Sequence, residues 1–459
     1  MTGAPGGGPA PSGPELIARL ERVRSSPWLV RARIVVGSAT FFDAFDALSL
    51  AFVLPVLVVR WKLSPRDVGW LIAAGYLGQL LGALVFGRLA ERWGRIRAAA
   101  GATALMSVMS LLCAGAGSLP WLIALRFVQG IGIGGEMPVA AVYINELSRA
   151  QGRGRFFLLY ELIFPVGLMV TGQIGAQLVP AFGWQIMLLA GGVPGLVVTA
   201  LLLRLPESPR WLIEHGQLAR ADAIIAEIEA SAGPSAPPPE PAAASPAPRA
   251  ATTGPRGRWS ELLSPRYRGP TAIVWVLWTT AYLITNGLNN WMPTLYQRTY
   301  HLGLSQALRA GTLTNVAQVV LLLGCAFAID RIGRRRWSIA CFAVGAALLA
   351  VLGLSGAGSV TAVVVLVSLS YGFVGSINAV LYLYTPEIYP TRMRALGTGA
   401  ATCWLRAASA AGPLLVGYLV DTAGIGSVFL AFGASGAIGA IAATRMMDTD
   451  NRRLEELAV

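Results

Sequence analysis

Long apolar segments recur along the chain, separated by short polar stretches. A bilayer core of about 30 Å is crossed by about 20 helical residues, and each of the twelve longest segments reaches that length. The pattern therefore predicts an all-α integral membrane protein with twelve transmembrane helices. The predicted spans are 34–58, 68–88, 98–118, 121–144, 156–179, 184–204, 271–295, 311–330, 337–356, 361–384, 396–420 and 425–445.

Basic residues alternate between the two sides of this predicted helix series. With the N-terminus inside, the inner segments carry 29 of the 36 basic residues and the outer loops carry 5. This is the positive-inside distribution of a membrane protein. We therefore expect a multi-pass protein in the lipid bilayer of a bacterial cytoplasmic (inner) membrane, with both termini cytoplasmic. The net charge of +13 follows from this bias and does not indicate a nucleic-acid partner.

Three charged signals occur twice, which indicates an internal repeat. Glu91 and Asp330 follow the second and eighth spans and are 239 residues apart. Glu146 and Glu387, after the fourth and tenth spans, are 241 apart. PESPRWLIE at 206–214 similarly corresponds to the charged C-terminal tail. Six spans per repeat make the repeats parallel, so we expect two six-helix bundles with the substrate path between them.

The repeat and the composition divide the chain into five segments. A central cytoplasmic loop contains an amphipathic helix at 216–230 and a Pro/Ala-rich stretch at 231–256, which is typical of a disordered linker. The expected segments are a cytoplasmic N-terminal segment (1–30), an N-terminal bundle (31–204), the cytoplasmic loop with its linker helices (205–268), a C-terminal bundle (269–446) and a cytoplasmic tail (447–459).

Acidic and basic residues alternate at the inner ends of the helices in both repeats. Such residues can form ion pairs when the inner side closes and separate when it opens, so we interpret them as a gating network; static determinants of topology are the alternative. The predicted members are Glu91, Arg92, Arg95, Glu136, Glu146, Arg153, Glu207, Arg210, Asp330, Arg331, Arg334, Glu387 and Arg392.

Six ionisable residues lie within predicted spans, where each costs at least about 2.5–3.5 kcal/mol to insert. They are Asp43, Asp46, Arg126, Glu136, Glu161 and Arg406. Asp43 and Asp46 are three residues apart and share a helix face, which disfavours ionisation of both. Arg406 can hold a carboxylate through two parallel hydrogen bonds. These residues predict a polar cavity between the helices.

The charged signals resemble the major facilitator superfamily over essentially the whole chain. PESPRWL at 206–212 and PEIYPTRMR at 386–394 are similar to its sugar-porter and organic-ion branch. The sequence DAFD at 43–46 resembles the first helix of aromatic acid:proton symporters, with Ala44 in place of a glycine. The resemblance implies the major facilitator fold and alternating access. It also implies a proton-coupling group in which Asp46, together with Asp43, lies opposite Arg126.

Further likenesses concern the substrate. The segment 404–413 resembles the eleventh helix of organic anion transporters, which places Arg406 at the anion. Sugar porters carry two glutamines where Leu283 and Ile284 stand, so a sugar would lose hydrogen bonds here. The first and fourth helices are similar to those of bacterial niacin (nicotinate) transporters. The substrate-binding residues expected on these grounds are Arg406, Glu161, Asn286, Asn289, Tyr382 and Trp404.

The sequence thus predicts a secondary transporter that imports a small aromatic monocarboxylate, such as nicotinate, with protons. A benzoate-type acid, a sugar or an exported drug are alternatives, and a non-transporting membrane sensor is a further one. The isolated His215 and His301 and four scattered cysteines offer no metal site and no nucleophile–base pair. We therefore expect no enzymatic activity, no metal and no cofactor, and we expect a monomer.

Overall fold

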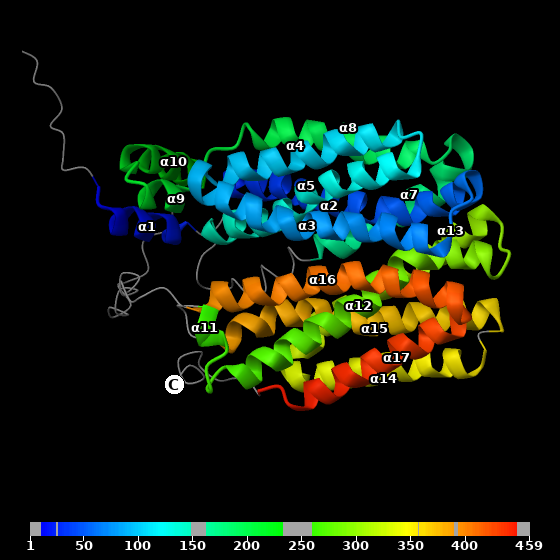
Figure 1. The fold of residues 1–459 in the computed structure, drawn as a ribbon. Helices are drawn as coiled ribbons and strands as arrows, with labels where there is room; N and C mark the ends of the chain where they lie inside the picture. The colour runs from blue at the N-terminus through cyan, green and yellow to red at the C-terminus, as the bar shows by residue number, and fades with distance from the viewer. Residues whose placement is uncertain are drawn as a thin grey trace, which may run out of the picture.

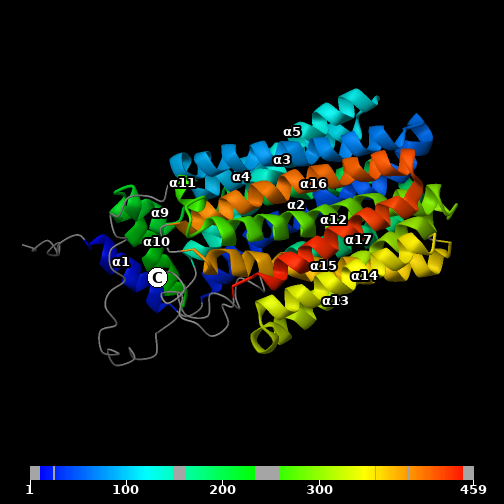
Figure 2. The ribbon, with the colours of Figure 1, turned by 60° about the horizontal axis from the view of Figure 1, so that its bottom comes forward.

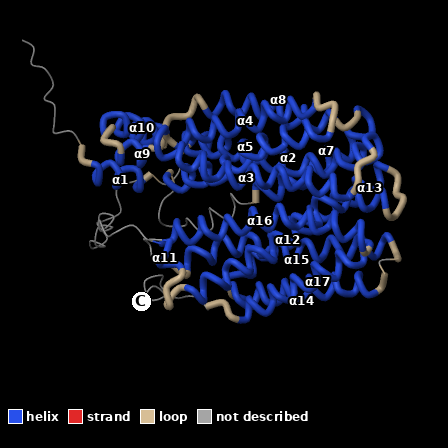
Figure 3. The backbone as a smooth tube through the Cα atoms, in the orientation of Figure 1, coloured by secondary structure: helices blue, strands red, loops and turns tan. Residues whose placement is uncertain are grey.

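The computed structural model describes residues 11–23, 26–147, 162–232, 259–356, 358–389 and 393–447, and all its regular elements are helices (Figure 3). The helices are α1 (Gly13–Arg22), α2 (Pro27–Trp61), α3 (Pro65–Trp93), α4 (Arg95–Ala114), α5 (Leu119–Glu146), α7 (Ile163–Phe182), α8 (Gln185–Leu202), α9 (Pro209–Glu214), α10 (Leu218–Ser231), α11 (Trp259–Leu262), α12 (Arg268–Arg298), α13 (Leu304–Ile332), α14 (Arg334–Leu354), α15 (Val360–Glu387), α16 (Arg394–Thr422) and α17 (Gly424–Thr444).

The long helices form two bundles that lie side by side (Figure 1). The N-terminal half contains α2 to α8 and the C-terminal half contains α12 to α17. Twelve of the described helices are long and apolar enough to cross a membrane, which confirms the predicted all-α membrane fold. The short helices α1, α9, α10 and α11 gather at one end of the bundles, here called the linker end (Figures 1 and 2).

Local sequence determines where several helices begin. Ser26 and Ser64 each precede a proline, which is favoured at the first helical position because its missing N–H needs no partner there. The hydroxyl of Ser26 accepts a hydrogen bond from the N–H of Leu29 at 3.1 Å. Ser64 and Asp67 cap one another reciprocally at the start of α3. The Ser26 cap thus sets the start of α2, and the reciprocal cap of Ser64 and Asp67 sets the start of α3 after the short loop that separates the two helices.

The repeat is visible in the turns that follow α3 and α13. Each turn is closed by a glycine with positive φ, Gly94 at 103° and Gly333 at 87°. A side chain would be strained in this backbone region. In the first turn the Glu207 carboxylate accepts hydrogen bonds from the N–H groups of Arg95 and Ile96, and so caps α4. A β-carbon on Gly94 would overlap that carboxylate.

The linker end holds an assembly of short helices beyond the ends of the long bundle helices (Figures 1 and 2). The predicted amphipathic helix at 216–230 is α10, and α1 packs against it through Leu16 and Leu20, which are buried. Arg19 of α1 binds Asp222 at 2.5 Å and Glu229 at 2.7 Å. Hydrogen bonding to Glu229 is the main cause that raises the pKa of Arg19. Helix α1 lies within the N-terminal segment 1–30, and its packing against α10 was not predicted from the sequence.

Polar contacts between the two halves lie at mid-depth and at the end opposite the linker helices. At that opposite end Arg66 of α3 pairs with Asp421 of α16 at 3.2 Å, and Arg298 donates to the carbonyl of Leu63 at 3.4 Å. Among the described residues, no ion pair or hydrogen bond joins the halves near the linker end. The halves are therefore closed together at the opposite end in this conformation.

Candidate substrate cavity

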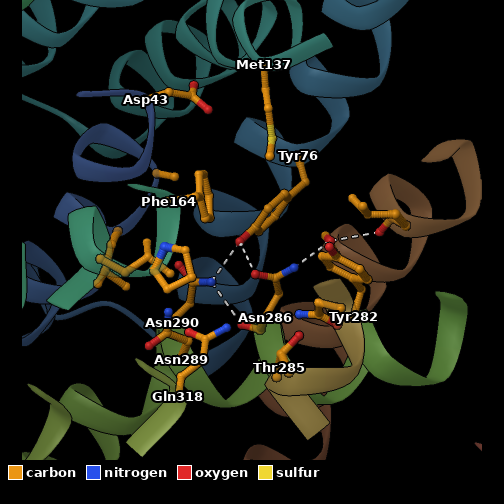
Figure 4. A pocket seen from close by; sticks show the side chains of 18 of the residues that line it. Asp43, Tyr76, Met137, Phe164, Tyr282, Thr285, Asn286, Asn289, Asn290 and Gln318 are labelled. Atoms are coloured by element: carbon orange, nitrogen blue, oxygen red, sulfur yellow. Dashed lines mark hydrogen bonds between the residues drawn. The ribbon is translucent and has the colours of Figure 1, made fainter. Parts of the chain in front are cut away.

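A cavity of about 130 Å³ lies between the two halves, near the middle of the long helices (Figure 4). Helices α2, α3, α5 and α7 of the N-terminal half and α12, α13, α15 and α16 of the C-terminal half supply its wall. A dry cavity of roughly 150 Å³ is known to hold one benzene molecule. The space therefore suits a substrate with a single aromatic ring.

Arg406 lines this cavity, as expected for the anion-binding residue, and only 8% of its surface is exposed. Its Nε donates to the carbonyl of Gln79 at 3.0 Å and its Nη2 donates to the carbonyl of Gly134 at 2.9 Å. Both acceptors belong to the N-terminal half. Among the described residues none accepts from Nη1, and this nitrogen is not among the buried atoms that lack a partner. One edge of the guanidinium is thus held and another remains for a ligand.

The carbonyl of Gly134 is available to Arg406 for a local reason. A helical carbonyl normally accepts from the N–H four residues later, but the residue four positions after Gly134 is Pro138, which has no N–H. Gly134 also allows α5 to approach α3 closely, since a β-carbon there would overlap the Gln79 carbonyl. Two carbonyls on neighbouring helices therefore converge on one guanidinium.

A chain of amides and hydroxyls also lines the cavity (Figure 4). The Tyr76 hydroxyl donates to Asn286 Oδ1 at 3.0 Å and accepts from Asn290 Nδ2 at 2.9 Å. Asn286 in turn donates to the Ser409 hydroxyl at 2.7 Å. Tyr76 belongs to the N-terminal half and its partners to the C-terminal half, so this network crosses the cavity. Of the predicted amides, both Asn286 and Asn289 line the wall.

Aromatic side chains line the cavity beside this network. The predicted Tyr382 is present, with Tyr282, Tyr371 and Phe164. Tyr282 stacks on Trp278 at 5.5 Å between ring centroids, and Tyr382 meets the same indole edge-on at 4.7 Å. Such packing holds the two phenol rings in place and leaves apolar faces for an aromatic ligand.

The cavity also contains an acidic side. Asp43 lines the wall and is 3% exposed, and its Oδ1 is buried without a hydrogen-bond partner. Asp46 is fully buried behind it, where Oδ1 accepts from the Ser110 hydroxyl at 2.9 Å. Asp46 therefore lies beside the cavity rather than in its wall.

Arg126 lies near Asp46, but the expected contact between guanidinium and carboxylate is absent. Its Nη1 donates to Gln129 Oε1 at 2.7 Å and, more weakly, to the backbone carbonyl of Asp46 at 3.4 Å. The Oδ2 atom of Asp46 and the Nε atom of Arg126 are both buried without a partner. The two side chains are thus neighbours whose charged groups are separated in this conformation.

Of the predicted substrate-binding residues, one lies outside the cavity wall and another lies outside the part of the chain that the structure describes. Trp404 is wrong as a wall residue, because its side chain is 42% exposed on the outside of α16 and packs on Trp275 at 5.4 Å. Its position two residues before Arg406 turns it away from the cavity. Glu161 lies outside the described residues.

The residues assigned to gating form ion pairs within each half. Arg95 binds Glu146 at 2.9 Å and Arg334 binds Glu387 at 3.3 Å. Each pair joins two helices of the same half, so both brace their own half in this conformation. Arg210 also contacts this region, by donating to the carbonyl of Glu146 at 2.9 Å.

The other predicted gating residues differ in position. Glu207 caps α4, whereas Glu136 is fully buried near the cavity. Three side chains are exposed at the linker end, namely Glu91, Arg92 and Arg331. Arg153 and Arg392, as well as the side chain of Asp330, lie outside the described part of the structure.

The sequence analysis missed several uncharged polar residues of the wall. They include Tyr76, Gln79, Gln318 and Asn378. Gln318 Oε1 and Asn378 Oδ1 are buried and without a partner. Tyr76 and Gln79 are three residues apart and share a helix face, a spacing that could have indicated them.

Comparisons with known proteins agree with this architecture. The family model described as "Sugar (and other) transporter" matches residues 44–459. The niacin transporter NiaP of Acinetobacter baylyi is 31% identical, over 91% of this chain and 93% of that protein. The 4-hydroxybenzoate transporter PcaK of Pseudomonas aeruginosa is 28% identical, over 81% and 82%. A partially occluded inward-open structure of the xylose transporter XylE from E. coli has a TM-score of 0.70 at 17% identity, covering 93% of this chain and all of that one.

Proposed function

Because the chain belongs to the sugar (and other) transporter family of the major facilitator superfamily, we propose that it imports a small aromatic monocarboxylate, nicotinate in the first instance, together with protons. As a member of this family it is a transporter and not an enzyme. The proposal places the linker end in the cytoplasm. Import then proceeds by alternating access, with the substrate bound between the two halves.

The observation that carries the proposal is the position of Arg406. A guanidinium with a free terminal nitrogen faces a cavity the size of one aromatic ring, and tyrosine rings form part of its wall. A carboxylate that binds there gains a charge-assisted hydrogen bond in a largely desolvated site. The two named relatives, for niacin and 4-hydroxybenzoate, are both transporters of aromatic compounds with this chemistry.

Proton coupling is assigned to Asp43, Asp46 and Arg126. Burying an ionised carboxylate costs desolvation free energy, so the group is stable either when it is protonated or when it is paired with a cation. In this proposal a change of proton occupancy alters the contact between Asp46 and Arg126. Because α2 and α5 both contribute to the cavity wall, that change is transmitted to the substrate site.

A hydroxylated benzoate is the second candidate, and one observation favours it. Gln318 Oε1 and Asn378 Oδ1 are acceptors in the wall that have no partner in the described structure. A phenolic hydroxyl can donate to either of them, whereas the nicotinate anion has no donor while its ring nitrogen is unprotonated. Discrimination between the two acids then depends on whether these acceptors are satisfied.

The test is uptake by purified protein in liposomes. Labelled nicotinate should accumulate when the external side is more acidic, and unlabelled nicotinate, benzoate and 4-hydroxybenzoate should be compared as competitors with xylose as the sugar control. Competition by the acids but not by xylose supports an aromatic monocarboxylate. Uptake that is unaffected by a pH gradient, or displaced only by xylose, rejects the proposal.

A further inference from the structure

Two carboxyl groups from different helices lie together on the acidic side of the cavity. Asp43 of α2 lines the wall, and Glu136 of α5 is fully buried one residue before Met137, which also lines it (Figure 4). The Thr40 hydroxyl donates to Glu136 Oε1 at 3.2 Å. Asp43 Oδ1 and Glu136 Oε2 are both buried and both lack a hydrogen-bond partner. Each carboxyl group therefore has an oxygen that the protein leaves unsatisfied.

Within the described part of the structure, three charged side chains face Asp43. They are Glu136 from α5, Asp46 from its own helix and Arg406 from α16. Arg126 of α5 lies next to Asp46. The described helices α7 and α8, which pack on α2, contain no ionisable side chain. The remaining titratable groups in the wall are the phenols of Tyr76, Tyr282, Tyr371 and Tyr382.

Electroneutrality determines how many protons this group can hold. The described site contains three acids, Asp43, Asp46 and Glu136, and two bases, Arg126 and Arg406. A net charge is expensive in such a desolvated site, so the empty cavity is stable with one proton on the acids. A bound monocarboxylate adds one negative charge. A second proton then restores neutrality.

We propose that Asp43 and Glu136 form the carboxyl pair that carries the transported proton, and that each monoanion brings one additional proton onto this pair. The inference rests on the proposed function. It reassigns Glu136 from the gating network to proton coupling. The proton from water bonds to the free carboxylate oxygen of the pair, while the substrate anion is balanced by Arg406. Substrate and proton then cross together without net charge.

The pair is chosen over Asp46 for a geometric reason. Asp46 also has an oxygen without a partner, but it lies behind the wall, next to the cationic side chain of Arg126. Asp43 and Glu136 each have one buried oxygen without a hydrogen-bond partner. Asp43 also lies within electrostatic reach of Arg406, the residue proposed to bind the anion. Either carboxyl can accept the second proton, so one of them is sufficient for coupling.

The experiment measures the affinity of the protein for nicotinate and for benzoate between about pH 6 and pH 9. In this range the carboxyl groups of both ligands are ionised. Benzoate is included because it has no basic nitrogen that could itself take up a proton. In the range where the free pair lacks the second proton, affinity should fall about tenfold per pH unit, since one proton is taken up per anion. D43N and E136Q should each keep this slope. The double variant D43N/E136Q should bind the anion with no pH dependence, because neither carboxyl remains.

Controls separate this inference from the proposed function. E227Q, which changes an exposed carboxylate of α10, should keep the slope. A slope that persists in D43N/E136Q overturns the inference even if the anion binds normally. Absence of binding by both acids in the wild type instead rejects the proposed function.

A direct count of protons keeps the test independent of the double variant's folding. Calorimetric titration of the wild type with benzoate, in buffers of different ionisation enthalpy, should report uptake of about one proton per anion bound. No net uptake overturns the inference. Replacing sodium by choline should leave the affinity unchanged, whereas a loss of binding would assign the buried pair to a sodium ion instead.

Discussion

Arg406, on α16 of the C-terminal half, donates a hydrogen bond of 2.9 Å from Nη2 to the backbone carbonyl of Gly134, on α5 of the N-terminal half. The residue proposed to bind the substrate is thus also a contact between the two halves. A carboxylate that binds the guanidinium therefore acts on a group that both halves position. This links occupancy of the cavity to the relative placement of the bundles.

Replacement of Arg406 should remove anion binding. We expect R406A to weaken binding of nicotinate at least about 30-fold, since truncation of one partner of a buried charged pair costs roughly 2 kcal/mol or more. R406K should recover part of the loss, because lysine keeps the charge and loses the planar fork. The measurement is ligand-induced thermal stabilisation of the purified protein. R336A, at an exposed arginine of α14, is the control, and an affinity in R406A equal to that of the control contradicts the assignment.

Replacement of Pro138 should loosen Arg406 without removing it. In P138A the N–H of residue 138 can bond the Gly134 carbonyl, which then competes with Arg406. The expected cost is that of about one hydrogen bond, roughly 1 kcal/mol or about fivefold in nicotinate affinity. P194A makes the same change inside α8, away from the cavity, and should have no effect. Equal affinities in the two variants would show that the freed carbonyl does not position Arg406.

Loss of the Tyr76 hydroxyl should weaken the association of the two halves in this conformation, because that hydroxyl makes hydrogen bonds between them. Y76F removes the hydrogen bonds to Asn286 and Asn290 and leaves amide groups unsatisfied, at a cost of roughly 1–3 kcal/mol. The conformation closed at the opposite end should then be less populated. A cysteine at Leu414, which packs on Gly69 across the halves, should react faster with an impermeant maleimide.

The labelling requires a background in which the native Cys403 is replaced by serine, because this cysteine is not fully buried. Y418F, at an exposed tyrosine of α16, is the matched control and should react at the wild-type rate. If Y76F also reacts at that rate, the hydroxyl does not stabilise this conformation.

Detachment of α1 should follow the loss of Arg19. This side chain joins α1 to Asp222 and Glu229 of α10, and all three are partly exposed, so the contact is screened by salt. R19A should speed amide hydrogen exchange in residues 13–22, and high salt should do the same in the wild type. R220A, which removes an exposed arginine of α10 bonded to Gln217, should leave this exchange unchanged.

Acid should loosen the same helix at its first turn. Hydrogen bonds from Ser12 lower the pKa of Glu15 below its usual value of 4.5. A group whose pKa is depressed in the folded state stabilises that state above its usual pKa, and the contribution is lost as the pH falls through the lowered value. Protection from exchange at the start of α1, measured against the intrinsic exchange rate at each pH, should therefore fall in acid, and E15Q should reduce this pH dependence. A pH profile shared by E15Q and wild type would exclude the capping role.

The helices could be predicted from the sequence because membrane insertion depends on local properties. Apolar length, loop charge and the spacing of repeated signals each involve residues that are near one another in the chain. The same reasoning predicted Asp43 and Arg406 as candidate site residues, and both line the cavity, since an ionisable group in a span needs a compensating environment whichever helix it lies on. The charged residues of the PESPRWL segment likewise indicated polar contacts with neighbouring helices, and in the structure Glu207 caps α4 and Arg210 donates to the carbonyl of Glu146.

The partners of those residues depend on helix rotation and approach, which no local pattern contains. Arg406 binds carbonyls rather than a side chain because Gly134 lets α5 approach α3 and Pro138 frees one acceptor. Asp43 faces Glu136 across two helices that are far apart in the chain, whereas the spacing of acids along the sequence had indicated Asp46 as its partner. Trp404, two residues from Arg406, points outward for the same geometric reason. The free energy of membrane insertion is a property of each helix by itself, so the sequence of that helix is enough to predict it. The binding cavity instead depends on how eight helices pack against one another, which only the tertiary structure decides.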